Sequence, residues 1–302
     1  MLQQTLMHAI NYTGIGLHSG KDVEMKLLPA KIDAGISFHI HTKKDVSVIK
    51  ADPFAVTTTE LATSLGNGKV HVSTVEHLLA ALFALGIDNA ECHVYGKEIP
   101  IMDGSALPIT NLIKKAGIRS QYALRKVAKI TRPFLFEANG KTINARPYDG
   151  FYVDYTIDFP HKAIGVQRLA LEITPETFDE VASARTFGFM KEVEYLHSKN
   201  LALGGSLANA IVIGDEGVVN PEGLRFADEF VRHKILDFIG DMAMFGMPLQ
   251  GAFEVRCSGH QHNNAFLREM YTHKDQYLRF EELIPEQRKA DIPYLGLGTA
   301  MA

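Results

Sequence analysis

The chain has 302 residues, of which 46% are hydrophobic and 22% charged, and its 31 basic and 35 acidic side chains leave a net charge of −4. This composition is typical of a globular protein with a substantial core, and it excludes a disordered chain or a coiled coil. The balanced charge provides no field that would gather nucleic acid, so we expect no nucleic-acid partner.

Neither a secretory signal nor a membrane span is evident in the sequence. The N-terminal segment "MLQQTLMHAI" lacks a basic start, an apolar stretch and a cleavage site, and no apolar run is long enough to cross a membrane. We therefore expect a cytoplasmic protein. Only Cys92 and Cys257 are present, far apart, so closely spaced cysteines supply neither a disulfide framework nor a thiolate zinc site. Any metal must be held by histidines and carboxylates.

Two alternating stretches near the start of the chain predict half-buried strands: residues 21–29, "KDVEMKLLP", and residues 35–42, "GISFHIHT". The second stretch places His39 and His41 on its polar face. Such a pair can chelate a metal, but histidines on the polar face of a strand are usually only solvent-facing residues. We therefore assign them no role from the pattern alone.

Helices are predicted after these strands. Residues 73–89, "STVEHLLAALFALGIDN", have the apolar spacing of an amphipathic helix that ends at Gly86. Ser73 and Glu76 have the spacing of a capping box at its start. Residues 107–117, "LPITNLIKKAG", predict a second helix after the turn "MDGS".

The second part of the chain repeats this order of elements. We place the boundary near residues 118–126, in the charged stretch "KKAGIRSQYALRK", which gives domains 1–120 and 121–302. Beyond it come strands "TINARP" and "FYVDYTIDF", a helical region "FMKEVEYLHSK", the Gly-rich stretch "LALGGSLANAIVIG", a long helix over 229–246 and a strand "GAFEVRCS". Strands and helices segregated in this way predict an α+β fold of two similar layers.

The long helix carries an unusual row of polar residues. His233, Lys234, Asp237 and Asp241 share one arc, opposite a strongly apolar face. The simplest interpretation is a solvated face with an i,i+4 His–Asp pair, worth a few tenths of a kcal/mol. The alternative is a metal site, for which His77, in the first turn of the earlier helix, is the best additional ligand.

Two imidazoles and one carboxylate would leave a fourth zinc position open for water, as in a hydrolase. The known zinc signatures do not support this pairing, because HExxH is absent and Ser73 stands where HxxEH requires its first histidine. Glu76 precedes His77, although a capping box would explain Glu76 without catalysis.

Several other stretches suggest weaker candidates. "TGIGLHSGK" matches neither the GxGxxG nor the GxxxxGK[ST] nucleotide loop. In "CSGHQHNNAF", His260 and His262 are expected in a glycine-containing turn before a helix, and loop histidines are usually surface residues. Cys257 and Ser258 raise the hypothesis of a nucleophilic hydrolase, but no G-x-S-x-G elbow surrounds them. Thr186 in "ARTFGF" is in a predicted loop, where threonine usually serves as a turn residue.

Six segments together resemble one known family. "GIGLHSGK", "STVEHLLAAL", "EIPIMDGSA", "ARTFGF", "GLRFADEFVRHKILDFIGD" and "SGHQHNN" occur in the order and spacing of the UDP-3-O-acyl-N-acetylglucosamine deacetylases of lipid A biosynthesis in Gram-negative bacteria, from about residue 3 to 295. The resemblance implies two similar βααβ-type sandwich domains packed face to face, with the active site in the cleft between them.

The resemblance also implies roles for individual residues. It assigns one zinc ion per chain, and zinc-activated water that attacks the N-acetyl group of UDP-3-O-(3-hydroxyacyl)-N-acetylglucosamine and releases acetate. This reaction is the committed step of the pathway. The sequence does not report whether iron replaces zinc in the cell. The implied zinc ligands are His77, His233 and Asp237; the implied catalytic residues are Glu76 as general base, His260 as acid or oxyanion stabiliser, Asp241 as its partner and Thr186 beside the oxyanion; the implied substrate contacts are Lys234, Phe187 and Phe159.

An acyl-binding insert is implied over about residues 190–215, where Val193, Leu201, Ala202 and Leu203 either line a passage or belong to an ordinary core. We expect a monomer. The hypotheses held against this one are a non-enzymatic binder of sugar nucleotides or acyl groups, which would tolerate loss of Glu76, and a metal-independent hydrolase based on Ser258 or Cys257.

Overall fold

The computed structural model describes residues 1–284, and the central strands and helices of its two halves follow the same order. The first half contains β1 (Leu2–Leu6), β2 (Ile10–Ile15), β3 (Asp22–Pro29), β4 (Ile36–His41), β5 (Val46–Lys50), β6 (Val56–Thr58), β7 (Ser64–Gly66), β8 (His71–Val72), α1 (Glu76–Ala84), β9 (Ala90–Tyr95), α2 (Leu107–Ala116) and β10 (Ile118–Leu124). The second half contains β11 (Lys126–Ile130), β12 (Phe134–Ala138), β13 (Lys141–Arg146), β14 (Phe151–Phe159), β15 (Gly165–Glu172), α3 (Asp179–Ala182), β16 (Phe187–Phe189), η1 (Met190–Glu192), α4 (Val193–Ser198), β17 (Ile211–Ile213), α5 (Glu229–Ala243), β18 (Leu249–Arg256), α6 (His260–Thr272), α7 (Lys274–Tyr277) and β19 (Leu278–Glu282).

The main sheets of the two halves share one topology. In the first sheet the strand order is β2-β3-β9-β4-β5, and only the β4–β9 pair is parallel. In the second, β12, β13, β18, β14 and β15 are neighbours in the same way, and β14–β18 is the corresponding parallel pair. β11 and β19 extend the second sheet beyond one end of β18. The repetition predicted from the order of elements is therefore present in the strand pairing.

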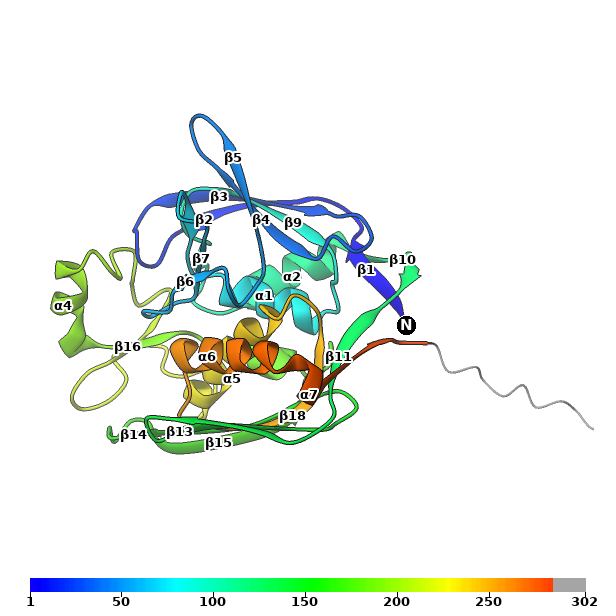
Figure 1. Cartoon of the computed structure of the whole chain (residues 1–302). Coiled ribbons are helices and arrows are strands. Elements are labelled where there is room, and N and C mark those ends of the chain that lie inside the picture. Colours follow the sequence, from blue (N-terminus) through cyan, green and yellow to red (C-terminus); the bar gives the residue numbers. More distant parts are fainter. Residues whose placement is uncertain (285–302) are drawn as a thin grey trace, which may run out of the picture.

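Helices α1, α2, α5 and α6 lie between the two sheets (Figure 1). α1 and α2 belong to the first half and α5 and α6 to the second, and α1 packs directly against α5. Each sheet turns its apolar face towards these helices, because the strands alternate buried and exposed residues. Phe38, Tyr155 and Phe238 are among the large side chains that are fully buried in this common core. The expected α+β architecture of two similar, facing halves is confirmed.

The connection between the halves lies at one edge of the molecule. The expected boundary at 120/121 falls inside β10, which pairs with β1 at the start of the chain, and the division into two domains stays a prediction. Residues 190–215 include α4, which lies apart from the stacked layers (Figure 1). Within residues 1–284, no helix is long and apolar enough to cross a membrane. The C-terminal segment "LGLGTAMA" lies outside the described residues.

Candidate active site

Helices α1 and α5 cross so closely that only glycine fits at the contact. A Cβ atom on Gly240 would lie 2.0 Å from the carbonyl oxygen of Glu76. This approach places the first turn of α1 beside the middle of α5. His77 therefore lies next to His233 and Asp237, although the two segments are distant in the sequence.

These three side chains form a compact group of potential metal ligands. One ligand atom from each of His77, His233 and Asp237 lies within 4.8 Å of the other two, and all three residues are buried. Asp237 Oδ1 lies 3.6 Å from His77 Nε2 and 3.4 Å from His233 Nε2. Two imidazoles and a carboxylate are ligands that zinc accepts. The donor set therefore fits a divalent transition metal.

Neighbouring groups prepare these side chains to bind a cation. The Nδ1 atom of His233 lies 3.1 Å from the carbonyl oxygen of Ala184, which leaves Nε2 as the free ligand atom when Nδ1 donates. Burial lowers the pKa of His233 to about 3, so its imidazole is neutral. Burial opposes ionisation of Asp237, but surrounding cationic groups outweigh it and hold the pKa of this carboxyl well below its usual value. Lys234 is one of them and donates to Asp237 Oδ2 at 2.8 Å.

Glu76 points into the same space and does not form the expected capping box. Val75 is the N-cap of α1, and Ser73 Oγ instead accepts a hydrogen bond from Ser64. The prediction was wrong because the backbone of Ser73 pairs with the segment around Glu98 and so lies outside the helix. The carboxylate of Glu76 accepts the backbone N–H of Thr63 at 3.1 Å, and burial raises its pKa to about 7.

His260 lies on the other side of this space, paired with Asp241. The structure places His260 and His262 in the first turn of α6, not in the turn that the sequence suggested. His260 Nδ1 lies 2.8 Å from Asp241 Oδ2. Burial lowers the pKa of His260, but the charges of Asp241 and Asp237 outweigh it and raise the pKa to about 9. The imidazole is therefore protonated at neutral pH.

Two residues that sequence reasoning missed complete the hydrogen bonds of Asp241. Thr63 Oγ1 donates to Asp241 Oδ1 at 2.6 Å, and Asn263 Nδ2 donates to Oδ2 at 2.8 Å. Asn263 stands three positions after His260, and one turn of helix brings both to the same carboxylate. Thr63 has no comparable signal, because only the tertiary fold brings its short segment to the helices.

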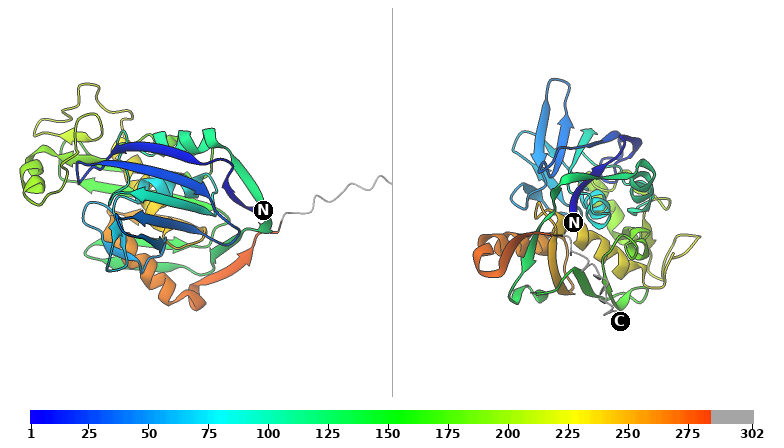
Figure 2. Two further views of the ribbon diagram at one scale, coloured as in Figure 1. Left: turned by 90° about the horizontal axis from the view of Figure 1, so that it is seen from above. Right: turned by 90° about the vertical axis from the view of Figure 1, so that its right-hand side faces the viewer.

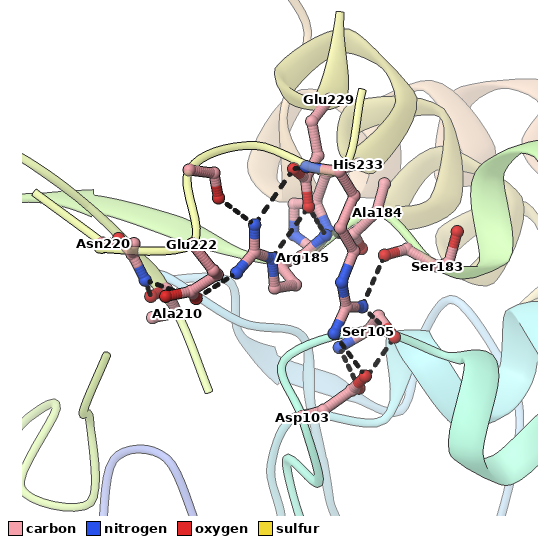
Figure 3. A network of polar contacts seen from close by, with 12 residues as sticks. Asp103, Ser105, Ser183, Ala184, Arg185, Ala210, Asn220, Glu222, Glu229 and His233 are labelled. Atoms are coloured by element: carbon pink, nitrogen blue, oxygen red, sulfur yellow. Dashed lines mark hydrogen bonds and ion pairs between the residues drawn. The ribbon is translucent and has the colours of Figure 1, made fainter. Parts of the chain in front are cut away.

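An ionic network next to His233 connects the loop at Arg185 to the start of α5 (Figure 3). Arg185 donates to Glu229 and also to Glu222 at 2.7 Å and to the carbonyl oxygen of Gly223. Glu229 is the first residue of α5 and lies one turn before His233. The polar row of α5 thus begins at Glu229, one turn earlier than we inferred from the sequence. The position of Glu229 in line with this row was the signal in the sequence that could have revealed it.

An apolar cavity of about 570 Å³ opens beside the ligand group. His233 and Lys234 border it together with the three remaining predicted site residues, Thr186, Phe187 and Phe159. Lys234 Nζ lies 5.6 Å from the centre of the Phe187 ring, and the rings of Phe187 and Phe159 are 5.7 Å apart. The structure therefore brings all ten predicted site residues to one connected region.

Residues of the segment 190–215 form much of the cavity wall. Val193 and Ala202 line it, as the sequence suggested, whereas Leu201 and Leu203 do not. Leu203 is 47% exposed and packs beside Gly20. The Gly-rich stretch near residue 16 also reaches this wall, where Glu98 accepts the backbone N–H groups of His18 and Ser19.

The residues of the nucleophile hypothesis are arranged differently. Ser258 donates its hydroxyl proton to the amide oxygen of Asn263 at 2.5 Å. Cys257 is a free, partly buried cysteine with a positive φ of 53°. Asn263, and not an imidazole, accepts the Ser258 proton, so this contact supplies no general base for a serine nucleophile.

A buried glutamate with a raised pKa lies across a potential metal site from a histidine whose pKa is also raised, an arrangement that is typical of hydrolases. The chain belongs to the UDP-3-O-acyl N-acetylglycosamine deacetylase (LpxC) family, whose model matches residues 3–272. The enzyme is thus a deacetylase, a hydrolase that acts on an amide.

Three curated relatives carry the name UDP-3-O-acyl-N-acetylglucosamine deacetylase. The protein of Nitratidesulfovibrio vulgaris is 56% identical over 96% of this chain and 94% of its own length. That of Oleidesulfovibrio alaskensis is 52% identical over 100% of both chains. That of Neisseria meningitidis serogroup C is 48% identical over 93% of this chain and 94% of its own.

Proposed function

We propose that this enzyme removes the N-acetyl group of a UDP-linked, 3-O-acylated N-acetylglucosamine and releases acetate, as a step of lipid A biosynthesis. The observation that carries the proposal is the convergence of His77, His233 and Asp237 with Glu76 and the His260–Asp241 pair beside an apolar cavity. The names of the relatives supply the substrate class.

His77, His233 and Asp237 would hold the metal, with zinc as the expected ion. When bound there, zinc supplies the Lewis acidity that makes water a nucleophile near neutral pH. The three residues approach from two helices fixed by the contact at Gly240, so the ligands are positioned before the ion arrives. Lys234 keeps Asp237 ionised, which favours binding of a cation.

Glu76 acts as the general base. Its pKa of about 7, raised by burial, lets it accept a proton from water as the water oxygen bonds to the acetyl carbonyl carbon. The hydrogen bond from the Thr63 N–H holds the carboxylate in place. Breaking of the C–N bond then releases acetate, and the sugar amine takes up a proton.

His260 acts in its protonated form. Asp241 holds its Nδ1 proton, so Nε2–H faces the space beside Asp237, 3.8 Å from Asp237 Oδ2. That proton serves to neutralise charge on the carbonyl oxygen or to reach the leaving amine, and both uses require the imidazolium. Thr186 borders the same region and is proposed to donate its hydroxyl to the developing oxyanion.

The cavity provides a place for the acyl chain, because its wall is mostly apolar and it opens at the ligand group. Lys234, Phe187 and Phe159 at the cavity border are proposed to contact the polar part of the substrate. With a UDP-sugar as the proposed substrate, we propose that the reaction takes place in the cytoplasm. The expected monomer stays a prediction.

Deacetylation of the UDP-sugar by the purified chain tests the proposal. Chelation should abolish turnover and added zinc should restore it, and metal analysis should find one catalytic ion that is lost in His233→Ala. Glu76→Gln should lower kcat by about 100-fold or more without loss of metal. Full activity in metal-free protein, or in Glu76→Gln, would contradict the mechanism.

A further inference from the structure

The outer face of the first sheet carries a cluster of imidazoles that the deacetylase site does not use. β4 and β9 are the parallel pair at the centre of this sheet. Their alternation buries Phe38 and Cys92 towards the helices. It turns the intervening residues outward, onto the face that the left view of Figure 2 looks upon: His39, His41, Glu91, His93 and Tyr95.

Three of these side chains converge. The Cα atoms of His39 and His93 are register partners, and their rings stack with centroids 4.5 Å apart. His93 Nε2 lies 3.3 Å from Glu91 Oε2. One ligand atom from each of His39, Glu91 and His93 lies within 4.8 Å of the other two. Bonds of about 2.1 Å to a shared ion would draw donors at this spacing together through small side-chain rotations.

Neighbouring side chains contact the ring nitrogens of these histidines, as is usual for histidines that bind a metal. His41 Nε2 lies 2.9 Å from His93 Nδ1, so His93 directs its other nitrogen towards Glu91. The ring of His41 is itself stacked on Tyr95, with centroids 4.1 Å apart. Ser37 Oγ lies 3.1 Å from His39 Nε2.

The second sheet shows that strand pairing alone does not require such a cluster. On its corresponding outer face, Asp154 of β14 pairs with Arg168 at 2.6 Å, and Glu254 of β18 lies 3.6 Å from Arg146. These are ordinary solvent-facing ion pairs. In the first sheet, two i,i+2 pairs of potential ligands, His39 with His41 and Glu91 with His93, occupy adjacent strands instead.

We propose that His39, Glu91 and His93 bind a divalent transition-metal ion of the zinc class on the outer face of the first sheet. Two imidazoles and one carboxylate favour zinc, cobalt, nickel or copper over Ca²⁺ and Mg²⁺, which prefer oxygen ligands. The site shares no residue with the group around His77. Bound metal would join β4 to β9, and His41 is a positioning residue that acts through His93.

Titration of metal-free protein with Co²⁺, followed by the visible absorption of the bound ion and by equilibrium dialysis, tests the site. The wild-type chain should bind one ion at the outer face in addition to any ion at the deacetylase centre. His93→Ala should lose the outer ion and keep wild-type deacetylase activity once zinc is restored. His233→Ala should keep the outer ion, so the two sites are distinguished whatever the metal content of the deacetylase centre.

Further variants separate ligation from ring stacking. Glu91→Gln leaves the stacked rings intact and should also lose the outer ion. If His93→Ala does not fold, Glu91→Gln serves as the test in its place. His41→Ala should weaken Co²⁺ binding by about 10–100-fold. His71→Ala, at an exposed histidine of β8, should bind as the wild type does. Equal stoichiometry and affinity in wild type, His93→Ala and Glu91→Gln would overturn the proposal.

Discussion

Arg185 and Glu229 form an ion pair with 2.9 Å between Nε and Oε1, and their side chains are only 3% and 0% exposed. Arg185 follows Ala184, whose carbonyl oxygen contacts His233, and Glu229 begins the helix that carries His233. The pair therefore joins the loop that orients this imidazole to the helix that supplies it (Figure 3).

Removing one partner of this pair should cost stability and metal affinity together. Arg185→Met leaves the Glu229 charge buried without its guanidinium, and we expect a loss of about 3–5 kcal/mol in the free energy of unfolding. Metal affinity should fall by about 10–100-fold, because Ala184 no longer holds His233. Urea unfolding and metal titration measure both effects.

Arg168→Gln is the matched control. Arg168 pairs with Asp154 at 2.6 Å on the outer face of the second sheet, and its side chain is 67% exposed. Exposed ion pairs contribute about 0.2–1 kcal/mol, so stability and metal affinity should change little. Equal losses in both variants would show that the Arg185–Glu229 pair has no special role.

The contact at Gly240 predicts that one added methyl group disturbs both halves of the site. Gly240→Ala places a carbon 2.0 Å from the Glu76 carbonyl oxygen, so α1 and α5 must separate. Overpacking of this kind costs about 1–3 kcal/mol. The shift should also reduce metal content, because His77 moves relative to Asp237. Calorimetry and metal analysis check this, and Gly188→Ala, with open space around its Cβ, should keep wild-type stability.

The activity should depend on pH through two groups, one that must be deprotonated and one that must be protonated. Glu76 must be deprotonated to accept a proton, so kcat/KM should rise with pH up to about 7, and a bound cation would move this limb lower by stabilising the carboxylate. His260 must be protonated, so the rate should fall as pH rises through about 9, and a bound cation would move this limb lower as well by disfavouring the imidazolium.

The alkaline limb is tested by replacing His260. His260→Gln should have a much lower rate, and that rate should not decrease near pH 9. His262→Gln, on the same helix but packed against Phe136, should keep both limbs. If the alkaline limb persists in His260→Gln, a group other than His260 causes it.

Asp241→Asn should move that limb to lower pH. The neutral amide no longer favours the imidazolium, while burial continues to lower the pKa of His260. We expect kcat at pH 8 to fall by about 100-fold, the lower end of the contribution of general acid–base catalysis. Asp228→Asn, at the start of α5, should leave the profile unchanged. A profile with its alkaline limb still near pH 9 would show that Asp241 does not hold the proton on His260.

Local sequence patterns determined several central strands and the helices α1, α2 and α5. The alternation over 151–159 coincides with β14, and the apolar spacing from residue 107 gives α2. Gly86 follows α1 with φ 75°, as expected for a residue that ends a helix. These features depend on residues a few positions apart, so they can be recognised in a single sequence. The polar row on α5 was visible for the same reason.

The tertiary structure decided which long-range groups meet. The capping box failed because a strand bridge removes Ser73 from α1, and Thr63 and Arg185 gave no sign of their partners. The sequence alone placed two imidazoles on one face of β4, but the parallel register with β9 brings Glu91 and His93 to them. Packing of α1 on α5, which Gly240 permits, likewise brings His77 to His233. Spacing along the chain fixes contacts within an element, whereas contacts between elements depend on how closely their backbones approach.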